Sequence, residues 1–198
     1  AENPAIPYAV FKVTGIFKAE LLEKAQTEAE LSEEEQENFD HSKEILGEIC
    51  QLAHQLDVRL FIDAEESWIQ TTIDRLTYEM MVKYNQKTAI IYNTFQMYRQ
   101  DMLANLKEAI AAAQEKDYFL GVKLVRGAYL EKERQKAHED EYSEPLHVCK
   151  EDTDRDYDLG VELCLKHLDR VHFCMGTHNE ASCLRLCDAM NALQIPQN

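Results

Sequence analysis

Three positively charged side chains, Lys12, Lys123 and Arg126, occur in or directly after apolar, strand-like runs. The last two lie in the segment GVKLVRGAYLEKER (121–134). Moving a cation out of water without a partner costs several kcal/mol, so each of them needs a counter-charge. The carboxylate of Asp63, at the end of another apolar run, can offset one charge. A bound anionic or electron-rich ligand could balance the rest, and the pattern therefore predicts a ligand site.

Other polar residues also follow the strand-like runs. They are Thr14, Glu65, Glu66, Asn93, Gln96, Tyr129, Thr177, His178 and Asn179. Taken singly, each has a structural explanation: Lys12 can extend its ammonium group to water, Asp63 or Glu66 can cap a helix, and Asn179 can be an N-cap. The prediction of a site therefore depends on whether these residues meet at one place.

An alternation of strand and helix patterns would bring them together. Strand-like runs occur at 10–16, 58–64, 88–93, 119–125 and 172–178. Helical spacing of apolar residues occurs between them, at 66–84, at 98–116 and after the possible cap Thr153-x-x-Asp156. The stretch 20–50, with Ser32-x-x-Glu35 as a capping box, is expected to add helix within the first crossover. The order predicts an α/β fold with a parallel sheet, either doubly wound or a (β/α)8 barrel, in which ligands bind beyond the carboxyl ends of the strands.

Several kinds of chemistry are disfavoured by the motifs. No GxGxxG follows a strand, no HExxH or metal-ligand spacing of cysteines occurs, and no GxSxG is present. Two chemistries stay open. Lys12 could form a Schiff base, as strand lysines of barrel aldolases do when burial lowers their pKa. Alternatively, the cations could hold a flavin, whose reduced, anionic form is stabilised by a neighbouring positive charge.

Composition restricts the partners and the compartment. The chain has 198 residues, 45% of them hydrophobic, which is enough for one domain over residues 1–198. A net charge of -16 argues against nucleic acid as a partner. No apolar run reaches the roughly 20 residues of a membrane helix, and the first residues lack the pattern of a signal peptide. Six cysteines without a framework spacing are interpreted as buried, reduced thiols.

Six segments, in this order, resemble the FAD-dependent proline dehydrogenases. They are FKVTGI, FIDAEES, YNTFQMY, GVKLVRGAYLEKER, TDRDY and GTHNE. KLVRGAY followed by THNE is specific, whereas IDAE alone is weak. The resemblance covers nearly the whole chain and implies oxidation of L-proline to Δ1-pyrroline-5-carboxylate on a (β/α)8 barrel with noncovalent FAD. It also implies a quinone as electron acceptor, and with it a possible peripheral contact with a membrane.

The same resemblance assigns roles to individual residues. Lys12 would pair with the substrate carboxylate, Asp63 would brace the site, and Lys123 would be the cation beside the flavin ring, where some relatives have Arg. The residues implied to contact the cofactor are Ala64, Asn93, Lys123, Arg126, Gly127, Ala128, Thr177, His178 and Asn179. Arg126, Gly127 and Ala128 would meet the pyrophosphate, and Asn93 would hydrogen-bond the flavin ring.

In one respect the chain departs from the family. The barrel of the relatives has a strand before FKVTGI and further strands and a helix with paired arginines after GTHNE, so five of eight strands are expected here. Three alternatives to proline oxidation stay open: a hydroxyproline dehydrogenase, a Lys12 Schiff-base aldolase and a catalytically inert barrel fragment. The expected location is the cytoplasm or the membrane periphery of a bacterium, with the mitochondrial inner membrane or matrix as the alternative.

Overall fold

Five parallel strands form one sheet in the order β1-β2-β3-β4-β5. The computed structural model describes residues 8–195. The strands are β1 (Tyr8–Lys12), β2 (Arg59–Asp63), β3 (Ile91–Gln96), β4 (Leu120–Val125) and β5 (Val171–Gly176). The helices are the short 3-10 helix η1 (Val13–Gly15), α1 (Ala19–Gln26), α2 (Glu33–Gln55), α3 (Ser67–Tyr84), α4 (Met102–Glu115), α5 (Leu130–Glu139), α6 (Lys150–Lys166) and α7 (Glu180–Ala192).

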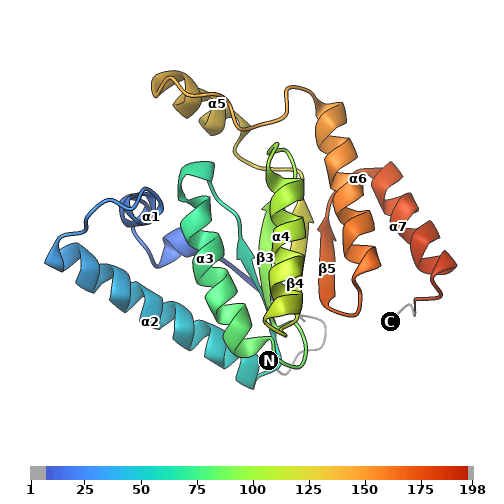
Figure 1. Cartoon of the computed structure of the whole chain (residues 1–198), viewed down its shortest axis with the longest axis horizontal. Helices are drawn as coiled ribbons and strands as arrows, with labels where there is room; N and C mark the ends of the chain where they lie inside the picture. Colours follow the sequence, from blue (N-terminus) through green and yellow to red (C-terminus); the bar gives the residue numbers. More distant parts are fainter. Residues whose placement is uncertain (1–7, 196–198) are drawn as a thin grey trace.

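The predicted α/β class is confirmed, and the consecutive strand order is that of an arc of a (β/α)8 barrel. Helices α3, α4 and α6 pack on one face of the sheet (Figure 1). A continuous apolar core, which includes Ile62, Leu106 and Leu124, lies between the sheet and these helices. The other face carries a smaller cluster around Phe61 and Tyr92. Helix α5 lies beyond the carboxyl ends of the strands (Figure 1).

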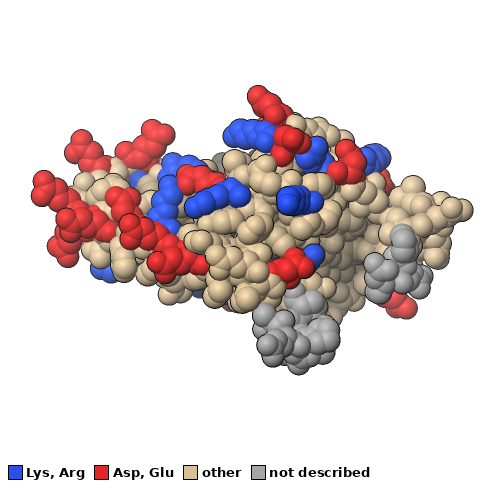
Figure 2. Space-filling view, turned by 90° about the horizontal axis from the view of Figure 1, so that it is seen from below, with Lys and Arg blue, Asp and Glu red and all other residues tan. Residues whose placement is uncertain are grey.

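The long first crossover holds two helices, as predicted for 20–50. The Ser32 hydroxyl accepts a hydrogen bond from the Glu35 amide at 3.3 Å, and the Ser32 amide donates to Glu35 Oε2 at 3.0 Å, so the predicted capping box starts α2. Acidic side chains gather at the end of the molecule formed by α1 and the start of α2 (Figure 2). The acidic side chains of this stretch face solvent, as its composition predicts.

Several predicted boundaries are wrong, among them the ends of the third and fifth strands, which lie at Gln96 and Gly176 rather than at residues 93 and 178. The first strand ends at Lys12 rather than residue 16, because η1 follows it, and α4 begins at Met102 rather than residue 98. Helix α6 begins at Lys150, so Thr153 lies in its first turn and does not cap it.

The third strand begins at Ile91, three residues later than predicted, and the buried side chain of Asn85 explains the shift. Its Oδ1 accepts hydrogen bonds from the amides of Ile90 and Ile91 at 2.9 Å, and its Nδ2 donates to the carbonyls of Ile91 and Phe119. These bonds hold the stretch before Ile91 as a loop.

All six cysteines are free thiols, as predicted for reduced residues. Cys50 and Cys164 are buried in the core and Cys174 is partly buried. The expectation of burial is wrong for Cys149, Cys183 and Cys187, which are exposed. Cys149 is the N-cap residue before α6, and Cys183 and Cys187 are carried by α7, in which the only buried residue of those described is Ser182. Among residues 8–195, no helix is both long and apolar enough to cross a membrane.

Candidate functional site

A cavity of about 530 Å³ opens at the carboxyl ends of the strands, and we call it the mouth. It is lined by Lys12, Asp63, Ala64, Thr94, Gln96, Lys123, Val125, Arg126, Gly127, Ala128, Lys150, Gly176, Thr177, His178 and Asn179. The structure thus brings together every residue predicted for the site except Asn93. The parallel register explains the gathering, since Lys12 pairs with Asp63 and Thr94 with Lys123 on adjacent strands.

Lys123 and Asp63 form the ion pair at the centre of the mouth. Lys123 Nζ lies 2.6 Å from Asp63 Oδ1, and the two side chains are 21% and 25% exposed. The ammonium group also lies 5.9 Å from the centroid of the Phe61 ring. Asp63 therefore supplies the counter-charge that the sequence predicted for one strand cation, and it fixes the position of that cation.

Lys12 donates a hydrogen bond from Nζ to the Tyr129 hydroxyl at 2.6 Å. Partial burial disfavours the ammonium form, but the bond to Tyr129 and the nearby carboxylates of Asp63 and Glu65 leave the Lys12 pKa raised. A Schiff-base lysine needs a lowered pKa to be a nucleophile near neutral pH. The environment of Lys12 therefore favours a fixed positive charge and disfavours the aldolase alternative.

Arg126 holds the end of β4 to helices α6 and α7. Its Nε lies 2.5 Å from Asp154 Oδ1, its two terminal nitrogens donate to the hydroxyls of Thr177 and Ser182, and the guanidinium stacks over the Tyr157 ring at 4.2 Å. These contacts satisfy the charge of Arg126 within the protein. Since a guanidinium has five N–H groups, two remain for a ligand in the mouth.

Gly127 takes a conformation that other residues rarely adopt. Its φ is 148°, and a Cβ there would lie 2.4 Å from atoms of the Tyr98 ring. The following amide, that of Ala128, donates to Gln96 Oε1 at 3.1 Å. The chain therefore turns tightly over Tyr98 into the mouth, but of the two backbone amides predicted to meet a pyrophosphate, that of Ala128 is already bonded.

The end of β5 combines a cap with an exposed imidazole. The Thr177 hydroxyl accepts from the Asn179 amide at 3.0 Å, and the Asn179 side chain accepts from the Ser182 amide at 3.1 Å. Asn179 is thus the N-cap of α7, as its structural explanation predicted. His178 is exposed and lines the mouth.

Asn93 lies on the opposite face of the sheet. It is 1% exposed, and its Nδ2 donates to Asp74 Oδ1 on α3 at 2.8 Å. Because β3 continues to Gln96, three residues beyond its predicted end, Asn93 falls in mid-strand, where side chains alternate between faces, instead of at the strand end. The structure therefore does not place it where a ligand in the mouth would reach it.

The amide that does line the mouth is Gln96. Its Nε2 donates to the Glu65 carbonyl at 2.7 Å, and its Oε1 accepts from Ala128. The sequence placed Gln96 after a strand but gave it no role. Side chains two residues apart in a strand lie on the same face of the sheet. Had the third strand been predicted to continue to residue 96, this rule would have placed Thr94 and Gln96 together on the face that lines the mouth.

Helix α5 is seated over the sheet by a buried carboxylate. Glu133 is fully buried, and its two oxygens accept from the Ser67 amide at 2.6 Å and the Ser67 hydroxyl at 2.5 Å. Glu133 thereby caps α3 from a distance of 66 residues, whereas Glu66, one of the predicted caps, makes no capping hydrogen bond. Tyr129 directly precedes α5, so this contact also positions the partner of Lys12.

The donor set of the mouth fits a flavin. Fixed cations can face an electron-accepting ring and phosphates, and Gln96 offers an amide beside them. The same set offers no metal centre, since no group of three or more His, Cys, Asp or Glu residues with metal-binding geometry occurs among the described residues.

Residues 10–198 match the sequence model of a family described as "Proline dehydrogenase". Proline dehydrogenase 1, mitochondrial, of Drosophila melanogaster is 34% identical over 162 residues, which cover 77% of this chain and 24% of that protein. The Caenorhabditis elegans protein of the same name is 36% identical over 159 residues, with 76% and 25% covered. The Hydroxyproline dehydrogenase of Xenopus laevis is 32% identical over 169 residues, with 83% and 36% covered.

Solved structures show the same fold. Proline utilization A (PutA) from Bdellovibrio bacteriovorus superposes with a TM-score of 0.81 at 19% identity, over 94% of this chain and 19% of that one. PutA from Corynebacterium freiburgense gives 0.80 at 19% identity, over 96% and 20%. The chain therefore spans about a quarter of the length of the first two relatives and a fifth of the PutA chains.

Proposed function

Because the chain belongs to the proline dehydrogenase family, we propose that its mouth forms part of a flavin-dependent site that oxidises L-proline. The product would be Δ1-pyrroline-5-carboxylate. The observation that supports this proposal is the meeting of three cations, Lys12 from β1 with Lys123 and Arg126 from β4 and its end, at one cavity of an acidic chain. Cations placed there would bind a carboxylate and stabilise electron density added to a ring.

The position of each residue in the mouth sets the role that we propose for it. Lys12, kept protonated by Tyr129 and the neighbouring carboxylates, would bind the proline carboxylate. Lys123, held by Asp63, would place a positive charge beside the cofactor ring, with Ala64 and Gln96 near it. Arg126, Gly127, Ala128, Thr177, His178 and Asn179 would lie along the nucleotide.

Proline dehydrogenases depend in general on a flavin, and bound FAD would supply the hydride acceptor. The protein's own contribution is orientation, because holding reactants in a productive geometry can lower a barrier by roughly 7–11 kcal/mol. We further propose a quinone as the final electron acceptor, reached at a membrane surface. This would place the protein at a bacterial membrane or at the mitochondrial inner membrane, and six of the matched relatives are named mitochondrial.

The test is anaerobic reduction of the flavin by L-proline in the full-length protein. Lys123→Met should slow the reduction by about 100-fold, the order expected when one preorganised electrostatic contact is lost, while circular dichroism stays unchanged. Lys107→Ala, which removes an exposed cation from α4, is the matched control and should have no effect. Full-length protein that binds no flavin, or a Lys123→Met rate equal to that of the control, would refute this function.

Hydroxyproline is the second candidate substrate, because the Xenopus laevis relative named for it covers 83% of the chain. Measuring flavin reduction with trans-4-hydroxy-L-proline alongside L-proline separates the two. Faster reduction by proline supports the first proposal, and faster reduction by hydroxyproline supports the second.

A further inference from the structure

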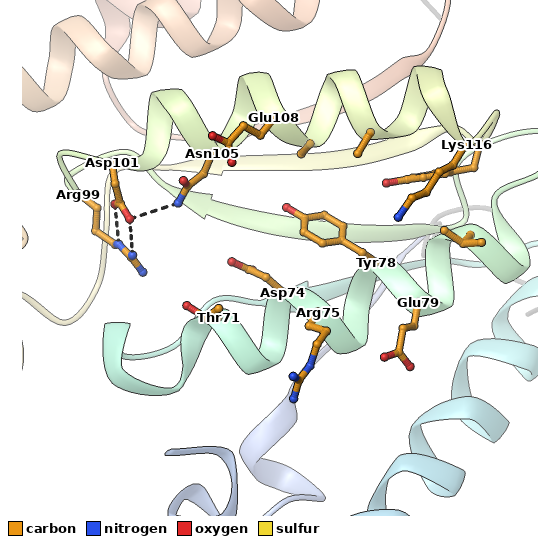
Figure 3. Close-up of a pocket in the computed structure, with 14 residues that line it drawn as sticks. Thr71, Asp74, Arg75, Tyr78, Glu79, Arg99, Asp101, Asn105, Glu108 and Lys116 are labelled. Carbon is orange, nitrogen blue, oxygen red and sulfur yellow. Dashed lines mark hydrogen bonds and ion pairs between the residues drawn. The ribbon is translucent and has the colours of Figure 1, made fainter. Parts of the chain in front are cut away.

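A second cavity, of about 860 Å³, lies between α3 and α4, on the helix side of β3 (Figure 3). We call it the α3–α4 groove. Its lining residues are Thr71, Asp74, Arg75, Tyr78, Glu79, Val82, Arg99, Asp101, Asn105, Glu108, Ala109, Ala112, Lys116 and Tyr118. It shares no lining residue with the mouth. Its volume lies within the range of about 300–1,000 Å³ that is usual for small-molecule sites.

Asp74 is a carboxylate without a matching cation in this groove. Its Oδ1 accepts hydrogen bonds from the neutral amides of Gln70 at 2.7 Å and Asn93 at 2.8 Å. Within residues 8–195, no Lys, Arg or His forms an ion pair with Asp74, and no donor reaches its Oδ2. Burial raises the pKa of Asp74 more strongly than the two amide bonds and the charge of nearby Arg99 lower it. The fold therefore maintains an acid at a position that disfavours its charge.

Arg99, the neighbouring arginine, does not form an ion pair with Asp74. Arg99 is bound by Asp101 through two hydrogen bonds, at 3.0 and 2.7 Å. Figure 3 shows Asp74 and Tyr78 extending from α3 toward α4, with Asp101 and Asn105 facing them, while Arg75 and Glu79 point away. The polar end of the groove therefore presents unpaired acceptor capacity from Asp74 and Asn105 and the hydroxyl of Tyr78.

One wall of the groove is apolar, although Thr71, Glu108 and Lys116 also line the cavity. Val82, Ala109 and Ala112 line it together with the rings of Tyr78 and Tyr118. A small ligand with a positively charged head and an apolar arm matches this division, because its head would supply the missing counter-charge and its arm would cover the aliphatic and aromatic wall. A metal ion fits poorly, since no cluster of three potential ligands occurs within the described range.

We propose that the α3–α4 groove binds a small organic amine, whose ammonium group pairs with the free oxygen of Asp74 and whose apolar arm lies against Tyr78 and Ala112. The strong negative charge of the chain attracts such cations. This site is independent of the proposed oxidation of proline, because β3 separates the groove from the mouth: Asn93 faces the groove side, and Thr94 and Gln96 line the mouth.

The test is calorimetric and NMR titration of the full-length protein with 2-phenylethylamine, and with 2-phenylethanol as the uncharged analogue of similar shape. The amine should bind at least tenfold more tightly than the alcohol, since a charged hydrogen bond contributes about 1.5–3 kcal/mol and about 1.4 kcal/mol is tenfold in affinity. The largest amide shifts should occur at Asn93, Asn105 and Tyr118.

Two variants and one control locate the site. Asp74→Asn keeps an oxygen for Gln70 and Asn93 but loses the charge, so amine affinity should fall about tenfold or more. Tyr78→Phe should weaken binding a few-fold and carries the test if Asp74→Asn fails to fold. Glu115→Gln removes the same charge from an exposed position at the end of α4 that does not line the groove, so affinity should stay unchanged.

The competing explanation is general attraction of cations to an acidic surface. Equal weakening by Asp74→Asn and Glu115→Gln, equal binding of the alcohol, or amide shifts confined to the mouth would overturn the proposal. Absence of measurable amine binding would overturn it as well.

Discussion

Replacing Glu133 by Ala should release α5 from the sheet. The change removes both acceptors of Ser67, and a hydrogen bond to a charged group contributes about 1.5–3 kcal/mol. Once α5 moves, the Ser67 hydroxyl can hydrogen-bond to water, which offsets part of this cost. We therefore expect Glu133→Ala to weaken the docking of α5 onto the sheet by about 2–4 kcal/mol. Little else would compensate, because the other buried residue of α5 is Ala137 and the salt bridges of Lys132 and Lys136 are at the surface.

Hydrogen exchange measures this loss directly. Amides within α5 should exchange roughly 30-fold to 1,000-fold faster in Glu133→Ala, since about 1.4 kcal/mol corresponds to tenfold. Glu133→Gln keeps one acceptor for the Ser67 amide, so its exchange rates should lie between those of the wild-type protein and those of Glu133→Ala. The control is Glu131→Gln, an exposed position in the same helix, which should leave exchange unchanged.

Unchanged protection of α5 in Glu133→Ala would refute the assignment of Glu133 as the residue that seats this helix. A functional readout separates positioning from mere stability. In flavin-loaded, full-length protein, the displaced Tyr129 should raise the KM for L-proline more than it lowers kcat, because Tyr129 contacts Lys12.

Three further changes test other contacts. Gly127→Ala should cost about 1–3 kcal/mol of unfolding free energy in urea, because the new methyl group would overlap the Tyr98 ring; a stability equal to wild type would contradict the tight turn. Asn85→Ala should cost about 3–5 kcal/mol, since it removes four hydrogen bonds to backbone groups that are buried or partly buried; a loss below 1 kcal/mol would show that the loop before Ile91 is held by other contacts. Asp74→Asn should increase stability near pH 7: a carboxyl with a raised folded pKa favours folding at low pH, and that advantage is lost as the pH rises through the interval from its unfolded to its folded pKa. The gain in unfolding free energy of Asp74→Asn over the wild-type protein, measured by urea unfolding, should therefore shrink as the pH is lowered through this interval. A gain that does not change with pH would contradict a raised pKa of Asp74.

The local features of this protein follow from its sequence. Apolar runs separated by helical spacing predicted five parallel strands, and Ser32 with Glu35 predicted the start of α2. The runs left a doubly wound sheet and a barrel open, and the consecutive strand order of a barrel was expected only from the resemblance to the family. The gathering of Lys12, Asp63, Lys123 and Arg126 was also predictable, because parallel strands place their carboxyl ends at one edge. These inferences need only periodicity and the interactions of residues a few positions apart.

Contacts between distant segments decided the rest. The side chain of Asn85 holds the loop before β3, and β3 continues to Gln96, so that Asn93 lies in mid-strand on the helix face and Gln96 lies in the mouth. Glu133 caps α3 from another helix, and Arg126 is satisfied by Asp154, Thr177 and Ser182. No local pattern in the sequence predicts such pairs, because each of these residues could equally well bond to a neighbour in the sequence. Its hydrogen bond to a distant partner becomes favourable only when folding removes water as the competing partner. The unpaired carboxylate of Asp74 in the α3–α4 groove is likewise a property of the packed helices alone.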